Sequence, residues 1–333
     1  MTSSEPHRAD ASVAVIIVNW NGGELLARCL RALEAQTVRP KRIFVVDNAS
    51  RDGSCDRIAK DFPNVTLMRL DKNTGFAAGN NIAARQASDC DWIAPLNPDA
   101  FAEPRWLEAL IQAADKHPEY ASFGSRMLMA DTPELLDGVG DIYHVSGLVW
   151  REGHGVPASG AHLEEREIFS PCGAAAIYKR SAFVEADGFD EDYFCYVEDV
   201  DLGFRLRLLG HRCLYVPESV VLHKGSALTG KRSDFSIYYG HRNLVWTYVK
   251  NFPGVWFWIY LPLHMAMNLA ALLWFSVSGH AKPIWSAKID ALRGIPKAWR
   301  KRSAIQQRAR ARFTDVKKLM ATGLRSHMNR RRK

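Results

Sequence analysis

The chain has 333 residues, of which 47% are hydrophobic and 24% are charged. A chain of this length can form one large or two small domains with a hydrophobic core. The composition excludes a disordered chain, a collagen and a coiled coil. The net charge is +8, yet residues 280–333 hold 17 Lys and Arg against 2 Asp and Glu, whereas residues 1–279 hold 27 against 34. A mildly acidic body thus carries a basic tail, which predicts an anionic partner for the tail.

The ends of the chain and its cysteines indicate where the protein works. Residues 1–12 are polar and we expect them to be disordered, and the apolar run that follows is too short for a signal peptide. The six cysteines form no Cys-x-x-Cys pair, which argues against a zinc or thioredoxin-like site. A reducing cytoplasm is therefore the expected compartment.

Strand and helix signals alternate through the first half. The apolar, often β-branched runs at 13–18, 43–46, 65–70 and 92–96 predict buried strands, and helical spacing of apolar residues predicts helices at 25–33, 75–87 and 103–114. Alternation at this spacing predicts βαβ units and a parallel sheet, whose ligands bind at the carboxyl ends of the strands.

The second half is less regular. Residues 127–167 are rich in glycine and predict loops and short hairpins. Further strands are expected at 174–178 and 213–216, and helices at 181–186 and 201–209, the last of them stopped by Gly210. The composition shifts near residue 250, where an apolar segment begins.

Polar loops follow the four strands expected in the first half. For any single loop, capping of the next helix by Asp or Asn is as good an explanation as a function, but four in succession favour a binding site at one sheet edge. Neither a GxGxxG after the first strand nor a GxxxxGK[ST] is present, which weighs against a Rossmann dehydrogenase and a P-loop enzyme. The loops are Trp20-Asn21-Gly22, Asp47-Asn48, Asn73-Thr74-Gly75 and Asn97-Pro98-Asp99.

Five segments in this order resemble the family 2 glycosyltransferases with a GT-A fold, and most of all the rhamnosyltransferase-like branch that builds bacterial surface polysaccharides. The resemblance covers roughly residues 13–250 and implies an α/β fold with a mixed, mostly parallel sheet flanked by helices. It implies a nucleotide-binding half at 13–100 and an acceptor-binding half at 101–250. The segments are VAVIIVNWNG (13–22), VVDNASRDGS (45–54), NTGFAAGNN (73–81), LNPDA (96–100) and YVEDVDLGFRLR (196–207).

The resemblance implies a nucleoside-diphosphate sugar as the donor. Asp47 is similar to the carboxylate that accepts N3–H of a pyrimidine, a donor present in both uracil and thymine, so UDP and dTDP both fit. Trp20 stands where the family often has an aromatic residue that stacks on the base. Val18, Gly75, Phe76, Asn80 and Asn81 complete the implied donor pocket, although an ordinary polar helix face explains the two asparagines nearly as well.

A divalent cation, Mg²⁺ or Mn²⁺, is implied by Asn97-Pro98-Asp99, which stands where the family has its Asp-x-Asp metal motif. Asp99 would bind the cation that bridges the two phosphates, whereas Asn97 can only hydrogen-bond a ribose or sugar hydroxyl and offers no charge. His223 resembles a histidine that completes the metal or diphosphate site, and a structural histidine is the alternative. Arg242 would clamp a phosphate, and an ordinary helix-surface arginine explains it equally well.

The catalytic base is expected in Glu198-Asp199. An inverting transfer needs one carboxylate that deprotonates the acceptor hydroxyl as it attacks the anomeric carbon. By resemblance Asp199 is that base and Glu198 contacts the acceptor. The alternative is a solvated acidic loop that caps the next helix.

Residues 251–279 are expected to form an apolar, membrane-associated helical segment, and 280–333 a basic amphipathic tail. The 23 residues 255–277 carry no formal charge and as a helix would reach about 35 Å, enough to cross a bilayer. A single crossing would separate the body from its basic tail, against the positive-inside rule. We therefore expect a peripheral or re-entrant segment, kinked at Pro262, on the cytoplasmic face of the bacterial inner membrane, with the tail on anionic lipid. A buried helical core is the alternative.

The leading hypothesis is a membrane-associated, metal-dependent, inverting glycosyltransferase. Its donor would be dTDP- or UDP-linked, with dTDP-rhamnose as one candidate, and its acceptor a lipid-linked or growing glycan. A nucleic-acid-binding protein with a basic tail is the second hypothesis, but the acidic body argues against it, and no nucleic-acid partner is expected. A degenerate transferase scaffold is the third, and Asp47, Asp99 and Asp199 argue against that.

Overall fold

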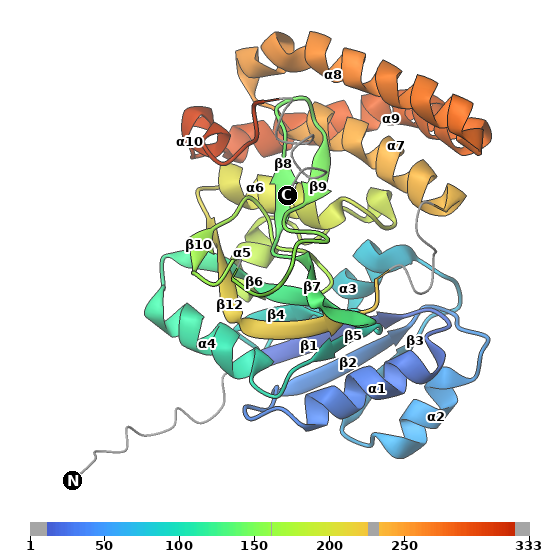
Figure 1. Ribbon diagram of the computed structural model, residues 1–333, viewed down its shortest axis with the longest axis vertical. Coiled ribbons are helices and arrows are strands. Elements are labelled where there is room, and N and C mark those ends of the chain that lie inside the picture. Colours follow the sequence, from blue (N-terminus) through green and yellow to red (C-terminus); the bar gives the residue numbers. More distant parts are fainter. Residues whose placement is uncertain (1–11, 161, 226–232, 324–333) are drawn as a thin grey trace.

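The computed structural model describes residues 12–160, 162–225 and 233–323. The disorder expected at the N-terminus and the basic cluster at 330–333 fall outside these residues, except for Ser12. A mixed sheet runs through the body, helices flank it, and a layer of long helices lies across one end (Figure 1).

The first half follows the expected alternation of strands and helices. Its elements are β1 (Val13–Asn19), α1 (Gly23–Glu34), β2 (Arg42–Asp47), α2 (Ser54–Asp61), β3 (Val65–Arg69), α3 (Gly75–Gln86), β4 (Trp92–Pro95), β5 (Ala100–Ala102) and α4 (Trp106–Lys116).

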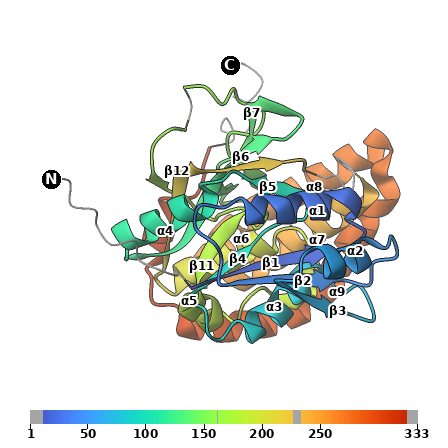
Figure 2. The same cartoon turned by 90° about the horizontal axis from the view of Figure 1, so that it is seen from below.

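Strands β1 to β4 pair in parallel in the order β3-β2-β1-β4, so the predicted parallel sheet is confirmed. The unbroken apolar run in β1 reflects burial on both faces. Val13, Val15 and Ile17 pack with α1, α2 and α4, whereas Ala14 and Ile16 pack on the opposite face with α3, α5 and α6. Figure 2 shows α1 and α2 on one side of these strands and α3 and α5 on the other.

The second half extends the sheet in mixed directions. The whole order is β10-β12-β6-β11-β4-β1-β2-β3, with β5 added beside β12 and β7 beside β6, and β8 and β9 form a separate hairpin. The remaining elements of the body are β6 (Tyr120–Met129), β7 (Thr132–Gly138), β8 (Asp141–Tyr143), β9 (Val149–Arg151), β10 (Arg166–Glu167), β11 (Ala176–Lys179), α5 (Arg180–Glu185), α6 (Glu198–Leu208) and β12 (Arg212–His223).

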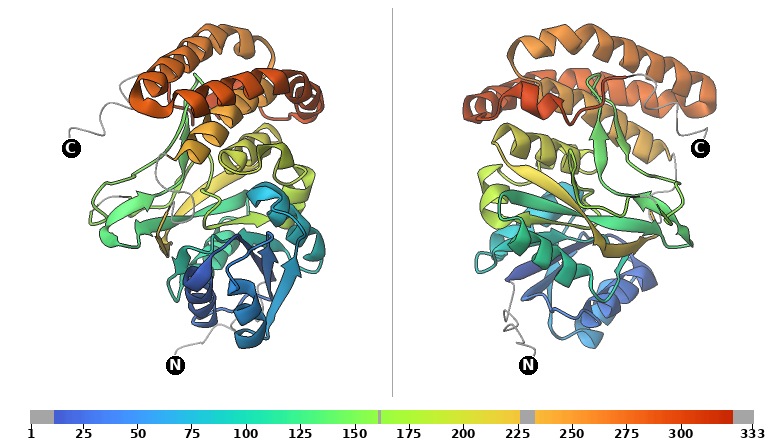
Figure 3. Two further views of the ribbon diagram at one scale, coloured as in Figure 1. Left: turned by 90° about the vertical axis from the view of Figure 1, so that its right-hand side faces the viewer. Right: turned by 60° about the vertical axis from the view of Figure 1, so that its left-hand side comes forward.

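The helical layer consists of α7 (Asp234–Asn251), α8 (Gly254–Phe275) and α9 (Ala281–Arg308), followed by the short α10 (Phe313–Lys317). Helix α8 continues through Pro262, and the backbone leaves helical geometry at Gly279, whose φ is +88°. The chain therefore turns back at Gly279, and α8 and α9 run together across the end of the molecule (Figure 3). Helix α7 packs along α9, although it lies within the predicted acceptor-binding half.

One part of this layer has the length and composition of a membrane span. Among the described residues, the run Gly254–Arg308 passes that test, and 11% of its most apolar window is buried inside the protein. Its apolar side chains are thus mostly outside the core.

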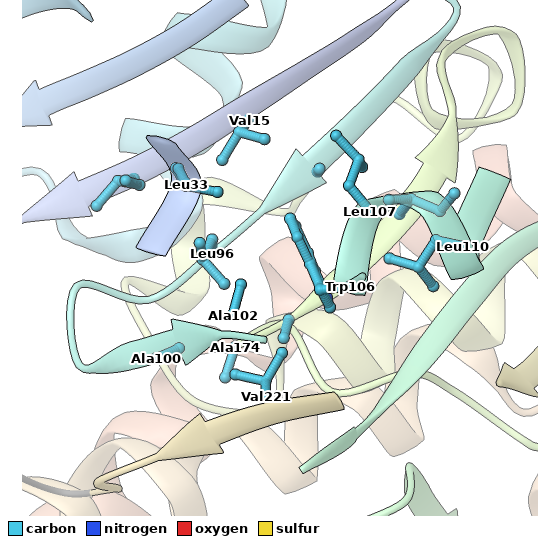
Figure 4. Close-up of a cluster of buried hydrophobic side chains, with 14 of the residues drawn as sticks. Val15, Leu33, Leu96, Ala100, Ala102, Trp106, Leu107, Leu110, Ala174 and Val221 are labelled. Carbon is cyan, nitrogen blue, oxygen red and sulfur yellow. The ribbon is translucent and has the colours of Figure 1, made fainter. Parts of the chain in front are cut away.

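Trp106 occupies the centre of one core cluster, between α4 and the sheet (Figure 4). Its side chain is fully buried, and its indole N–H donates to Ser125 Oγ at 2.9 Å. Ser125 also accepts from Ser219 Oγ at 3.0 Å, so the polar atoms on β6 and β12 at this point have partners.

We expect Trp106→Ala to lower the free energy of unfolding by about 3–5 kcal/mol, because it leaves a cavity and removes a hydrogen bond from a buried hydroxyl. Guanidinium chloride unfolding measures this change. Trp258→Ala is the matched control, since that indole is 62% exposed, and an equal loss in both variants would contradict the prediction.

Candidate active site

A cleft of about 760 Å³ opens at the carboxyl ends of the parallel strands. Residues from all four predicted polar loops line it, among them Trp20, Asn48, Asn73 and Asp99, so the prediction that these loops share one edge is confirmed. The predicted site residues that line the cleft are Val18, Trp20, Gly75, Phe76, Asn97, Asp99, Glu198, Asp199 and His223.

Asp99 and His223 meet because β5 pairs with the end of β12, where Ala100 lies opposite His223. His223 Nε2 lies 3.4 Å from Asp99 Oδ1, and Nδ1 lies 2.8 Å from Asp137 Oδ2. A carboxylate only accepts, so Nδ1 donates to Asp137. Burial alone would lower the pKa of His223, but the two carboxylates outweigh burial and raise it to about 9.

This pair fits a divalent cation. His223 Nε2 is buried and makes no hydrogen bond, and the nearest carboxylate oxygen belongs to Asp99. A carboxylate and an imidazole whose other nitrogen is fixed by a second carboxylate form a common ligand set. Asp99 and His223 are therefore the residues that would hold Mg²⁺ or Mn²⁺.

The adjacent carboxyl groups of Glu198 and Asp199 lie in different surroundings, although both belong to the first turn of α6. Asp199 Oδ2 accepts from the N–H of Gly173 at 2.8 Å, and Oδ1 accepts from the N–H of Val200 at 2.8 Å. Glu198 is buried, its Oε2 has no hydrogen-bond partner, and burial together with the charge of Asp199 raises its pKa well above the usual range. This difference suits a charged base beside a protonated neighbour.

The glycine-rich segment, where the sequence offered no assignment, contributes several polar residues to the cleft, among them Asp137, Asp141 and Arg151. Arg151 Nη1 donates to Asp137 Oδ2 at 2.8 Å, Nη2 donates to Cys172 Sγ at 2.6 Å, and Nε lies 3.7 Å from Asp141 Oδ1. Arg151 thereby connects Asp137, which contacts His223, with a group of residues that includes the predicted base, Asp199.

Asp141, Cys172 and Asp199 form that group, with their ligand atoms within 4.8 Å of one another. Arg151 places a positive charge beside this group. Burial and the charge of Asp199 raise the pKa of Asp141 to about 7. The sequence signal that could have pointed to these residues is DGVGD at 137–141, where two acids flank a pair of glycines. In the structure, a Cβ on Gly138 would lie 2.1 Å from Arg151 Cγ, so a glycine is required at this position.

Four predicted donor-site residues lie outside the cleft lining. Asp47 ends β2, with Oδ1 accepting from the N–H of Ser50 at 2.9 Å, and its contact with a base stays a prediction. Asn80 donates to the carbonyl of Phe76, and Asn81 bonds the backbone of Phe189 through both its oxygen and its nitrogen.

Arg242 is the fourth of these residues. It is buried on α7 and donates to the carbonyls of Asp192 and Tyr193 at 3.1 and 2.9 Å. Its guanidinium also lies over the rings of Tyr239 and Trp246. Both carbonyl contacts are made by Nη2, and the phosphate clamp stays a prediction.

Comparison with known proteins agrees with this arrangement. Residues 14–185 match the family model of Glycosyl transferase family 2. N-acetylglucosaminyl-diphospho-decaprenol L-rhamnosyltransferase of Mycobacterium tuberculosis is 31% identical over 242 residues, which are 65% of this chain and 77% of the relative. O-antigen chain rhamnosyltransferase RfbN of Salmonella typhimurium is 25% identical over 213 residues, which are 63% of this chain and 66% of the relative.

Among solved structures, GalNAc-T7 with UDP, GalNAc and Mn²⁺ matches with a TM-score of 0.62 at 16% identity. The match covers 84% of this chain and 54% of that one, and it shows the shared GT-A fold. The chain belongs to glycosyltransferase family 2, in its rhamnosyltransferase-like branch. The fold class and the enzyme class expected from the sequence are confirmed.

The raised pKa of Asp141 makes a prediction about stability. Between about pH 4 and pH 7 the folded protein keeps a proton on Asp141 that the unfolded chain has lost, so stability falls as pH rises through this range. Asp141→Asn removes this penalty, and we expect its free energy of unfolding to improve relative to wild type by up to about 4 kcal/mol between pH 4.5 and pH 8.

Urea unfolding of the metal-free protein at several pH values measures this difference. Asp61→Asn on the exposed face of α2 is the control, and we expect no pH-dependent difference for it. A constant offset between Asp141→Asn and wild type would contradict the assignment.

Proposed function

We propose that this enzyme transfers a sugar, with rhamnose the first candidate, from a dTDP- or UDP-linked donor to a lipid-linked or polysaccharide acceptor with inversion. The observation that carries the proposal is the shared cleft: the Asp99–His223 pair and the Glu198–Asp199 pair both line it. Support for the sugar and the acceptor comes from the names of the relatives, one of which acts on a diphospho-decaprenol acceptor.

Asp199 is the base in this proposal. It takes the proton of the acceptor hydroxyl while that oxygen attacks the anomeric carbon, and the bond from the anomeric carbon to the diphosphate oxygen breaks with its electrons on the leaving group. One carboxylate suffices, since no covalent intermediate forms. The Gly173 and Val200 amides fix both oxygens of Asp199, and Glu198, in its protonated form, donates to the acceptor.

Asp99 and His223 hold Mg²⁺ or Mn²⁺, which supplies positive charge to the diphosphate of the donor when it is bound. Asp137 accepts a hydrogen bond from His223 Nδ1, and Nε2 is directed toward Asp99. Because the pKa of His223 is raised to about 9, a cation that binds here would take the place of the proton on Nε2. Lys224 follows directly, is exposed in the cleft lining, and has its backbone N–H bonded to the carbonyl of Asp99 at 3.0 Å. Its ammonium is a second positive charge for the diphosphate.

The helical layer would place the enzyme on the cytoplasmic face of a bacterial membrane. We define the apolar helix surface by Trp258, Leu269, Leu273 and Trp274 of α8 with Trp285 and Leu292 of α9, each more than half exposed. An interfacial helix pair with exposed tryptophans fits the boundary of a bilayer.

Some of the basic residues of the tail form ion pairs within the protein. Lys297 and Lys301 pair with Asp190 and Asp192 of the body, and Arg308 pairs with Asp187. Among the described residues, Lys282 and Arg300 are exposed on α9 without an acidic partner. In this proposal the apolar helix surface contacts the membrane together with the basic tail.

Turnover tests the proposed base. We expect Asp199→Asn to lower kcat by a factor of about 10²–10⁴ and to leave the donor Kd within twofold, because the base acts only in the transfer step. Release of UDP or dTDP is followed with Mg²⁺ or Mn²⁺, a panel of donors and an N-acetylglucosaminyl-diphospho-polyprenol acceptor. Asp61→Asn serves as the control, and full turnover by Asp199→Asn would rule out this base.

Vesicle binding tests the membrane contact. We expect the double variant Trp258→Asp/Trp274→Asp to bind anionic vesicles at least about tenfold more weakly, because it removes two apolar anchors. The matched control is Leu163→Asp/Val184→Asp, two exposed apolar residues of the body. Binding that survives the tryptophan changes but disappears in high salt would assign the contact to the basic tail instead.

A further inference from the structure

The segment that precedes the proposed base has an unusual backbone. Phe194, Tyr196 and Val197 have φ values of 65°, 66° and 71°, in the left-handed region that side chains rarely adopt and that is most unfavourable for a β-branched residue. Such conformations persist only where the surroundings hold them. We call residues 193–197 the strained loop. Val197 is the N-cap of α6, so this loop determines where the helix begins and how its first residues, Glu198 and Asp199, are placed.

Asn243 on α7 binds the strained loop along its length. Its Nδ2 lies 3.0 Å from the carbonyl oxygen of Tyr193, 2.9 Å from that of Cys195 and 2.8 Å from that of Tyr196. The side chain is fully buried. One amide nitrogen thus bridges three of the five carbonyls of the loop.

Arg242 fixes the orientation of that amide. Arg242 Nε donates to Asn243 Oδ1 at 3.0 Å, which leaves the Asn243 nitrogen facing the loop. Arg242 Nη2 also donates to the carbonyl of Tyr193 at 2.9 Å. The two neighbouring side chains therefore act as one unit, which we call the loop brace.

Other residues of α7 contact the same loop. The ring of Tyr239 stacks on Phe194 at 5.0 Å, and Thr247 Oγ1 lies 2.9 Å from the hydroxyl of Tyr193. On its other side the loop contacts the donor half: the N–H of Ala77 donates to the carbonyl of Phe194 at 3.2 Å, and a Cβ on Gly75 would lie 2.4 Å from that oxygen. The loop thus connects the donor side of the cleft with the base.

We propose that Asn243 and Arg242 are positioning residues for the transfer step, holding the strained loop in the conformation that directs Glu198 and Asp199 into the cleft. This proposal rests on the proposed function, because it assumes that Asp199 is the base. It also gives Arg242 a task other than the phosphate clamp expected from the sequence. Neither residue lines the cleft, so both act through the loop.

The decisive variant is Asn243→Asp, which keeps the shape of the side chain but replaces the amide donor with a second oxygen that the loop carbonyls repel. Arg242→Lys is the second variant, because it keeps the charge and loses the bond to Asn243. Arg302→Lys is the matched control: Arg302 is also buried, also donates to two carbonyls, those of Val249 and Phe252, and also lies over aromatic rings, but it does not contact the strained loop.

We measure kcat, donor KM, donor Kd by calorimetry with Mn²⁺, Tm, and hydrogen–deuterium exchange of residues 193–200. For both loop-brace variants we expect kcat to fall at least about 30-fold, the donor Kd to stay within twofold, and exchange to accelerate in this segment. For Arg302→Lys we expect a similar loss of Tm with kcat within threefold of wild type.

Two results would overturn the proposal. Unchanged exchange at 193–200 in a folded Asn243→Asp or Arg242→Lys variant would show that the loop does not depend on the brace. A donor Kd weakened tenfold by Arg242→Lys, with exchange unchanged, would restore the phosphate clamp. Should Asn243→Asp not fold, Arg242→Lys and Asn243→Ser answer the same question. Hydrogen–deuterium exchange can be measured without turnover. A wild-type protein without transferase activity would refute the proposed function, and the exchange data alone would then decide whether the loop brace holds the strained loop.

Discussion

Carboxylates converge on one edge of the sheet, and the rest of the structure depends on how their repulsion is balanced. A buried charge without a partner is costly, and here the partners come from segments far away in the chain. His223 and Arg151 neutralise Asp137 on the cleft side. Behind the cleft, buried Lys250 of α7 lies 2.9 Å from Asp201. The site is therefore a balance of charges contributed by several elements.

This balance explains why an acidic body carries a basic C-terminal segment. Helix α9 delivers Lys297, Lys301 and Arg308 to the acids at 187–192, immediately before the strained loop. Part of the charge asymmetry visible in the sequence is thus satisfied within the protein, and the helical layer is fixed to the catalytic body by ion pairs as well as by its aromatic core. The surface that remains open on α8 is mainly apolar.

The sequence predicted an element correctly where the residues of that one segment determine its structure. Strand β1 was predictable because both its faces are buried, and the loops after β1 to β4 were predictable because parallel strands bring their carboxyl ends to one edge. Strand β6 was missed because its residues Ser122, Gly124 and Ser125 interrupt the apolar pattern, and its hydroxyls find partners only in the folded sheet. Arg151 was missed for a related reason, since its acidic partners are assembled by a hairpin whose register the sequence does not reveal.

The two sides of the cleft are consequently built in different ways. The donor side rests on loops fixed by adjacent parallel strands, where each backbone position follows from the sheet. The side of the proposed base rests on a loop with unfavourable backbone geometry, held by side chains of α7. Damage to the helical layer should therefore reach the transfer step before it reaches donor binding, because the strands that shape the donor pocket do not depend on α7. The placement of the proposed base thus depends on α7, and α7 packs along α9, one of the two helices that carry the apolar helix surface.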